Sequence, residues 1–407
     1  MMTEQEHSNV QCTMNNVQWR KVRFGEFFDM LPTNTLSRDK LNNQRGEYQN
    51  IHYGDVLIKY PYCLDCNVND IPYINEGVRF NTAQVKNGDV IFADTAEDDT
   101  VGKCVEVLNV GDRKIVSGLH TYFCRPKHEM APGYLGYFLN SNHFHNQLLP
   151  YIAGSKVSSV NRTSIARTFI FYPESLPAQR RIAAILSSAD KVIASTQKVI
   201  AKYKQMKQGL MEDLLEPREG WKMVRLGDVG EIVTGSTPAT TKAEYWDGEY
   251  NFYSPADFGE NVYCAKTDRT ITAAGMKTGR PVPANSIMVA CIASIGKIAI
   301  NRTEGITNQQ INTIIPNDDY NFRFLYYLLS FNVEKIKGKA AQTTIPIINK
   351  EDFSNLEFSV PILAEQRRMA AILLGIDAKI AAEERVLEKY NLIKKGLMEK
   401  LLNEYNN

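Results

Sequence analysis

LPAQRRIAAILSSADKVIASTQKVIAKYKQMKQGLMEDLL, residues 176–215, returns near the end of the chain as LAEQRRMAAILLGIDAKIAAEERVLEKYNLIKKGLMEKLL, residues 363–402. The two stretches align without a gap at an offset of 187 residues, and 21 of the 40 positions are identical. A repeat of this length indicates that one structural plan is used twice in the chain.

Both repeated stretches are predicted to be long α-helices. They are rich in Ala, Leu, Lys, Gln and Glu, and apolar residues recur every three or four positions, from Ile182 to Leu214 and from Met369 to Leu401. At roughly 1.5 Å per residue each helix would extend about 60 Å, so its apolar stripe needs a partner along that length. We expect the two helices to pair as an antiparallel coiled coil. Because Lys379 and Glu383 interrupt the second stripe, the pair should be looser than a strict heptad pattern.

A second pair of landmarks defines the domains. Trp19-Arg-Lys-Val-Arg-Phe-Gly resembles Trp221-Lys-Met-Val-Arg-Leu-Gly at an offset of 202, and the segments between landmarks differ. Short β-branched runs separated by Gly, Asn, Asp and Pro predict mixed α/β domains there. The fold class is therefore α+β, with two mixed α/β domains that are each followed by a long helix. The expected parts are a disordered leader (1–16), domain 1 (17–175), a helix (176–216), domain 2 (217–362) and a helix (363–407).

Composition excludes several classes of protein. The chain has 47 Lys and Arg residues against 46 Asp and Glu residues, so a nucleic-acid surface would have to be a local patch. No apolar run reaches the roughly 18 residues that cross a bilayer, and the N-terminus lacks the apolar core of a secretion signal. An odd number of cysteines, seven, fits reduced thiols. We therefore expect a cytoplasmic protein without membrane contact.

One cysteine pair has metal-ligand spacing. Cys63 and Cys66 are separated by two residues, but the other cysteines are isolated, and His143 and His145 are too close together to complete a zinc site. Two small side chains in a turn are the simpler interpretation. We predict no metal site.

The order of domain, long helix, domain, long helix resembles the DNA-specificity subunit of type I restriction-modification systems. Ala-Gln-Arg-Arg-Ile-Ala-Ala-Ile-Leu (178–186) and Lys-Gln-Gly-Leu-Met-Glu (207–212) bound the first helix as in that family. The second domain adds Thr234-Gly-Ser-Thr-Pro, Gly296-Lys297 and Thr307-Asn-Gln-Gln-Ile-Asn312. The first domain lacks the Gly-Ser-Thr-Pro opening, so its assignment rests on position. The resemblance covers roughly residues 17 to 404.

The resemblance implies a non-catalytic subunit of a DNA adenine methyltransferase and restriction endonuclease complex. Two target-recognition domains would read a bipartite, asymmetric target in double-stranded DNA. Partners would be two methylation subunits, which bind S-adenosylmethionine, and restriction subunits that act as motor and nuclease. The chain has no Asn-Pro-Pro-Tyr or Asp-Pro-Pro-Tyr motif, no Gly-x-Gly-x-x-Gly loop and no Walker loop, so no cofactor is expected in this chain.

Candidate DNA contacts are donors on loops, since phosphate and base edges are bound by Lys, Arg, Asn, Gln, Ser and Thr. Each candidate could equally be an ordinary solvated side chain. Lys103 and Lys297 follow matched strands, and the remaining candidates lie in loops of the two domains. The full set is Lys103, Ser155, Lys156, Asn161, Arg162, Ser236, Thr237, Lys242, Lys297, Lys339, Gln342 and Thr343.

Features shared by both halves cannot distinguish two different half-sites. Sequence specificity must therefore lie where the copies differ, and partner binding where they agree. The repeated Gln-Arg-Arg motif is accordingly expected to bind the methylation subunits or to join domain and helix. Its members are Gln179, Arg180, Arg181, Gln366, Arg367 and Arg368. The acidic run from Asp94 to Asp99 is expected to lie off the DNA, or to place one carboxylate on a cytosine amino group.

Three alternatives remain open from the sequence. The chain could be the recognition subunit of a related restriction system that cuts beside its target. It could be a coiled-coil scaffold that binds only proteins, in which case it would show no salt-dependent DNA binding. The third alternative is an enzyme that stands alone and uses Cys63, Cys66 and a histidine to hold a metal ion.

Overall fold

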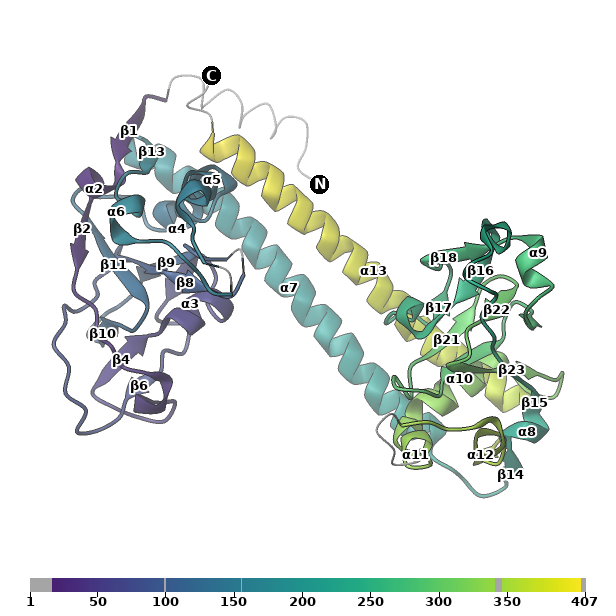
Figure 1. Ribbon diagram of the computed structural model, residues 1–407. Helices are drawn as coiled ribbons and strands as arrows, with labels where there is room; N and C mark the ends of the chain where they lie inside the picture. Colours follow the sequence, from purple (N-terminus) through teal and green to yellow (C-terminus); the bar gives the residue numbers. More distant parts are fainter. Residues whose placement is uncertain (1–16, 99, 155, 341–345, 404–407) are drawn as a thin grey trace, which may run out of the picture. The chain divides into compact units, whose positions relative to one another are not determined.

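The computed structural model describes residues 17–98, 100–154, 156–340 and 346–403. The chain divides into two compact units: the first comprises Met1–Ser195 and Leu387–Asn407, and the second Thr196–Val386. Both divisions fall inside the long helices α7 (Leu176–Leu215) and α13 (Leu363–Leu402), which Figure 1 labels. Each unit therefore contains one mixed α/β domain together with part of each long helix.

Each domain contains a five-stranded sheet of the same topology. Four neighbouring strands are antiparallel, and the fifth, at one edge, runs parallel to its neighbour. The order in the first unit is β2 (Phe28–Leu31), β11 (Thr121–Pro126), β7 (Val90–Ala93), β9 (Cys104–Leu108), β5 (Cys63–Asp65). The order in the second is β15 (Gly230–Thr234), β23 (Ile311–Pro316), β20 (Ile287–Ala290), β21 (Ile298–Asn301), β17 (Tyr263–Cys264).

A four-stranded sheet completes each domain, and here the copies diverge. The first unit has the order β10 (Lys114–Ser117), β4 (Tyr48–Ile51), β6 (Tyr73–Ile74), β3 (Leu41–Asn42). The second has β18 (Arg269–Ile271), β16 (Trp246–Tyr253), β22 (Gly305–Thr307), β19 (Pro281–Val282). The parallel pairs β4–β10 and β16–β22 correspond, while the outer strands differ. Two-stranded ladders pair β1 (Trp19–Arg23) with β13 (Phe169–Pro173), and β14 (Lys222–Arg225) with β24 (Glu357–Val360).

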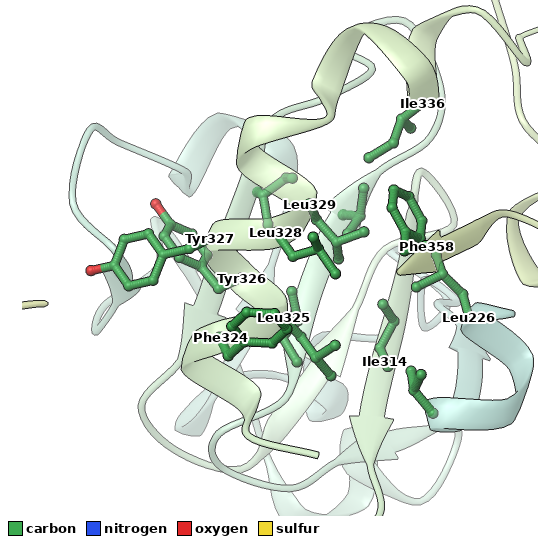
Figure 2. Close-up of a cluster of buried hydrophobic side chains, with 14 of the residues drawn as sticks. Leu226, Ile314, Phe324, Leu325, Tyr326, Tyr327, Leu328, Leu329, Ile336 and Phe358 are labelled. Atoms are coloured by element: carbon green, nitrogen blue, oxygen red, sulfur yellow. The ribbon is translucent and has the colours of Figure 1, made fainter. Parts of the chain in front are cut away.

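The hydrophobic core of each unit lies between its sheet and a helix that follows β11 or β23. In the second unit this helix is α10 (Phe322–Phe331), whose Phe324, Leu325 and Leu328 are buried. Figure 2 shows them beside Ile314 of β23 and Phe358 of β24. The corresponding helix of the first unit is α4 (Tyr134–Leu139), which is buried throughout.

The remaining short helices flank these cores. In the first unit they are α2 (Phe24–Phe27), α3 (Tyr53–Ile58), α5 (Asn142–Leu148) and α6 (Arg162–Ile165). In the second they are α8 (Leu226–Val229), α9 (Ala273–Met276), α11 (Val333–Lys337) and α12 (Lys350–Ser354).

The long helices pack against each other in antiparallel directions. Within the second unit Lys204 of α7 lies 3.0 Å from Glu384 of α13, and Lys207 lies 2.7 Å from Asp377. Residue numbers thus rise along one helix as they fall along the other. The predicted fold class, two mixed α/β domains each followed by a long helix that packs with its repeat, is confirmed. In the part of the chain that the structure describes, no helix combines the length and the apolar character needed to cross a bilayer.

Candidate nucleic-acid interface

Several loops of the first unit meet at one end of its five-stranded sheet. Backbone hydrogen bonds connect them: the Asn34 amide donates to the Ser117 carbonyl at 3.0 Å, and the Asp94 amide to the His120 carbonyl at 3.2 Å. The Val160 amide in turn donates to the Asp94 carbonyl at 3.1 Å. We call this region, made of segments 32–37, 94–98, 118–120 and 156–162, the loop end of the first unit; it includes the short antiparallel strands β8 (Thr95–Ala96) and β12 (Ser158–Ser159).

The second unit repeats these hydrogen bonds with other residues. The Ser236 amide donates to the Thr307 carbonyl at 2.8 Å, the Cys291 amide to Gln310 at 2.8 Å, and the Ile348 amide to Cys291 at 2.9 Å. Its loop end comprises the loops at 235–242, 291–297, 308–310 and 346–349. These matched hydrogen bonds show which residues are equivalent in the two units: Asn34 corresponds to Ser236, Asp94 to Cys291, and His120 to Gln310. One backbone frame therefore carries two different sets of side chains.

The candidates in the first unit are mostly held by their own domain. The Lys103 ammonium donates to the Leu57 carbonyl at 2.7 Å, and burial lowers the pKa of Lys103. Arg162 Nη2 donates to the Met30 carbonyl at 2.8 Å, and Asn161 caps α6 by accepting from the Ser164 amide. Lys156 is exposed, and Ser155 lies outside the described residues. Lys103 is thus the candidate that fits a phosphate contact least.

The second unit presents its candidates more openly. The Thr237 hydroxyl donates to Gln309 Oε1 at 2.6 Å, and Lys242 Nζ lies 3.2 Å from the Tyr245 hydroxyl. Lys297 and Lys339 are exposed, with Lys297 Nζ donating to the Pro255 carbonyl at 3.4 Å. Ser236 Oγ is buried and has no hydrogen-bond partner within the described chain. Gln342 and Thr343 lie outside the described residues.

The glutamines of the two Gln-Arg-Arg motifs join each helix to its own domain. Gln179 is 1% exposed; it accepts from the Ala131 amide at 2.8 Å and donates to the Pro173 carbonyl at 2.7 Å. Gln366, also 1% exposed, bonds to the Asn321 amide and the Pro361 carbonyl, both at 2.9 Å. Of the two expectations for these glutamines, their burial favours the joint between domain and helix over a partner contact, because a partner could not reach these side chains. The surface left for a partner consists of the arginines: Arg180, Arg367 and Arg368 are exposed, and Arg181 is half-buried.

Some polar residues at the loop ends were missed as candidates. Asn308, Gln309 and Gln310 follow β22 and cross the loop end of the second unit, and Gln309 is exposed. His120 occupies the corresponding place in the first unit, where its Nδ1 lies 3.4 Å from Asp94 Oδ1. The sequence carries a signal for this site, since Thr307 to Asn312 contains a run of amide side chains.

Cys63 and Cys66 lie in or beside strand β5 of the first unit. No group of three or more His, Cys, Asp or Glu residues in the described chain could hold a metal ion. Cys63 lies in β5 and packs near Gly133, and burial raises the pKa of Cys66 to about 11. Both therefore stay as neutral thiols near neutral pH. Of the acidic run, Asp94 contacts His120 and Thr95, and Asp98 accepts from Thr100.

Comparison with known proteins gives a consistent result. The family described as "Type I restriction modification DNA specificity domain" matches residues 16–205 and 218–391. The chain is 31% identical over 181 residues to the type I restriction enzyme MjaIX specificity subunit of Methanocaldococcus jannaschii, which covers 42% of each protein. It is 30% identical over 193 residues to the HindI specificity subunit of Haemophilus influenzae, covering 45% of this chain and 41% of that protein.

One solved structure shows the same fold. The crystal structure of a type I restriction-modification S subunit from M. genitalium superposes with a TM-score of 0.60 at 16% identity. The superposition covers 96% of this chain and 97% of that one.

Proposed function

This chain belongs to the family of type I restriction-modification DNA specificity proteins, whose specificity subunits are themselves non-catalytic, and we propose that it reads a two-part DNA target. Each domain would read one half-site through its loop end. The observation that carries the proposal is the repeated backbone frame with different side chains. A repeated frame explains how both domains meet DNA in the same manner, and different side chains explain an asymmetric target.

The proposed partners follow from the family to which the chain belongs. Two methylation subunits would bind S-adenosylmethionine and modify an adenine in each half-site, which requires flipping that base out of the duplex. Restriction subunits with motor and nuclease activity would join the same complex. The exposed arginines Arg180, Arg367 and Arg368, present in both halves, are the proposed contacts for the methylation subunits. The complex would act on DNA in the cytoplasm.

Methylation mapping tests this function directly. The chain and its methylation subunit are co-expressed in a host whose DNA lacks adenine methylation, and all methylated adenines are mapped. The expected result is one motif with two defined parts separated by unspecified bases, which disappears when this chain is omitted. A continuous motif, or methylation that does not depend on this chain, contradicts the proposal. A protein scaffold would also fail to retain DNA in a salt-dependent manner when bound to the methylation subunit.

A further inference from the structure

One loop is held by the same backbone hydrogen bonds in both units. It connects β10 to β11 in the first unit and β22 to β23 in the second. In the first unit the Gly118 amide donates to the Ile51 carbonyl at 2.9 Å; in the second the Asn308 amide donates to Tyr253 at 2.9 Å. At the other end of the loop, His120 and Gln310 accept from matched amides. The loops therefore align residue by residue as Gly118-Leu119-His120 and Asn308-Gln309-Gln310.

In the second unit this loop is an array of hydrogen-bonded amide side chains. Asn308 Oδ1 accepts from the Gln310 amide at 3.0 Å, and Asn308 Nδ2 donates to Gln310 Oε1 at 3.1 Å. Gln309 is exposed, and its Oε1 accepts from the Thr237 hydroxyl at 2.6 Å. With its carbonyl oxygen held, Gln309 keeps its Nε2 group as a donor to an outside acceptor.

Two buried hydroxyl groups belong to residues that neighbour this array. Ser236 Oγ and Thr307 Oγ1 are buried and have no hydrogen-bond partner in the described chain. They flank the amide loop, since the Ser236 amide donates to the Thr307 carbonyl and Asn308 follows Thr307 directly. Buried hydroxyls without partners are uncommon, because each loses its hydrogen bonds to water. Both hydroxyl groups lie inside the domain, Thr307 with 0% exposure, so the part of this loop that another molecule can reach is the exposed Gln309.

In the first unit the same loop carries a histidine. His120 has φ 52°, in the left-handed region, and its side chain is 48% exposed. Its Nδ1 lies 3.4 Å from Asp94 Oδ1, and Asp94 also accepts from the Thr95 hydroxyl at 2.8 Å. The residue at the place of Asp94 in the second unit is Cys291, so this pair is specific to the first domain. A cavity of about 260 Å³ lies beside it, with Thr33, Thr35 and Arg162 in its wall.

We infer that these loops are the base-reading elements, with Gln309 the principal reader of the second half-site and His120, positioned by Asp94, that of the first. The inference rests on the proposed function. The ligand is the edge of a base pair in duplex DNA. A glutamine amide can bond adenine through N6 and N7, and an imidazole N–H can donate to a purine acceptor. Phosphate contacts from exposed lysines do not explain a difference between the half-sites, since phosphates are alike at every base.

The test compares methylated motifs among variants co-expressed with the methylation subunit in a methylation-free host. Gln309→Glu replaces the donor amide with an acceptor, so methylation of the original second half-site should fall by about tenfold or more, with the change at one base position. Thr237→Val removes the hydroxyl that holds Gln309 and should relax the same base position. His120→Gln should alter one position of the other half-site and leave the second unchanged. Gln205→Glu, an exposed position on α7, is the matched control and should leave the whole motif intact.

The outcomes separate this inference from the function on which it rests. If the wild-type chain directs no two-part motif, the proposed function fails. If the wild-type motif is present and Gln309→Glu leaves it unchanged at the wild-type rate, the inference is overturned. A change in the same half-site by Gln309→Glu and His120→Gln also overturns it. Loss of all methylation in Gln309→Glu, Thr237→Val and a Gln309→Ala variant alike would assign the loop to folding or assembly instead.

Discussion

Lys394 Nζ lies 2.5 Å from Asp190 Oδ1 and ties the end of α13 to the start of α7 within the first unit. The second unit has the equivalent contact, in which Lys207 lies 2.7 Å from Asp377. Asp377 is the repeat of Asp190 and Lys394 is the repeat of Lys207, each at the offset of 187 residues. Each aspartate also accepts from a tyrosine of its own domain: Tyr137 at 2.7 Å and Tyr327 at 2.6 Å. We call each set a Tyr–Asp–Lys lock. In both locks the lysine comes from the helix of the other repeat, so neither lock forms from one repeat alone.

Substitution of the lysine of one lock should lower the stability of the unit that contains that lock and leave the stability of the other unit unchanged. Lys394→Met keeps most of the side-chain volume but leaves the half-buried Asp190 carboxylate without its cation, so the first unit should lose about 1–2 kcal/mol of stability. Hydrogen exchange should show faster opening of α4, where Tyr137 lies. Lys395→Met, at an exposed neighbouring position, should have little effect. Lys207→Met should instead speed hydrogen exchange in α10, where Tyr327 lies. Equal destabilisation of both units by either substitution would contradict the independence of the two locks.

The buried Glu106 should make the first unit less stable as pH rises. Its two carboxylate oxygens accept from the Gly133 and Gly136 amides, both at 2.8 Å, and burial raises the pKa of Glu106 to about 7. Because the folded pKa exceeds the unfolded value, the folded state holds the proton more tightly. The contribution of Glu106 to the free energy of unfolding is therefore fully present below about pH 4 and decreases as pH rises towards 7. The total decrease is a few kcal/mol at most.

Urea unfolding at a series of pH values measures this effect. Glu106→Gln should flatten the decline between pH 5 and 7 that belongs to this group. It should also lower stability at acidic pH, since an amide offers one acceptor where the carboxyl group offers two. Ile300 has the corresponding place in β21, so the second unit should show no such decline from this position. A pH profile that the substitution leaves unchanged would show that Glu106 titrates normally.

The long helices could be predicted because their signal is local. Apolar spacing and helix-forming residues determine a 40-residue helix without reference to the rest of the fold. The Tyr–Asp–Lys locks could not be predicted in this way. Asp190 and Lys394 are far apart in the sequence, and at each place a charge in a helix is ordinarily a solvated residue.

The correspondence of the two loop ends was also hidden from the sequence. Asn34 corresponds to Ser236, yet Leu31-Pro-Thr-Asn34 bears little likeness to Val233-Thr-Gly-Ser236. The match rests on backbone hydrogen bonds, which do not depend on side-chain identity. For the same reason the first domain had to be assigned from its position. For the glutamines of the Gln-Arg-Arg motifs the sequence left two alternatives open, a partner contact or a joint between domain and helix, and only their burial favours the joint.

Charge reversal of Lys156 or Lys339 should weaken DNA binding without changing the motif. Both side chains are exposed, and an exposed lysine near a loop end is suited to phosphate. Lys156→Glu and Lys339→Glu should each lower affinity and reduce the slope of log K against log salt by about one. Binding of the complex with its methylation subunit is measured over a range of salt concentrations. Lys198→Glu, at an exposed position on α7, serves as control. An altered motif would instead make either lysine a base reader.

Exchange of residues 235–345 for the matching segment of another family member should change one half of the motif. This segment begins after β15 and ends before α12; it exchanges Tyr327 of the second lock for its counterpart in the other protein and leaves Lys207, Asp377 and the long helices in place. The rest of the unit should therefore still assemble. Methylation mapping should show a new second half-site beside the original first one. Changes in both halves would contradict the assignment of one domain to one half-site.

The two locks lie at equal intervals along the two helices. The interval from Asp190 to Lys207 in α7 and the interval from Asp377 to Lys394 in α13 are both 17 residues. An insertion in one helix alone would leave one lock out of register. Four residues inserted after both Ala201 and Glu388, which are equivalent positions of the repeat, lengthen both intervals equally. The added turn rotates each downstream apolar stripe by only about 40°, so the helices should still pack and both locks should still form.

We expect the helix pair to set the number of unread bases between the half-sites. The double insertion adds about 6 Å of helix, which at roughly 3.4 Å per base pair corresponds to one or two base pairs. Methylation mapping should therefore show both half-sites unchanged and a spacer longer by one or two bases. The insertion in α7 alone is the comparison: it should lower stability, because either Lys207 or Asp190 loses its partner. An unchanged spacer with full methylation in the double insertion would show that flexible joints, rather than the helices, set the separation.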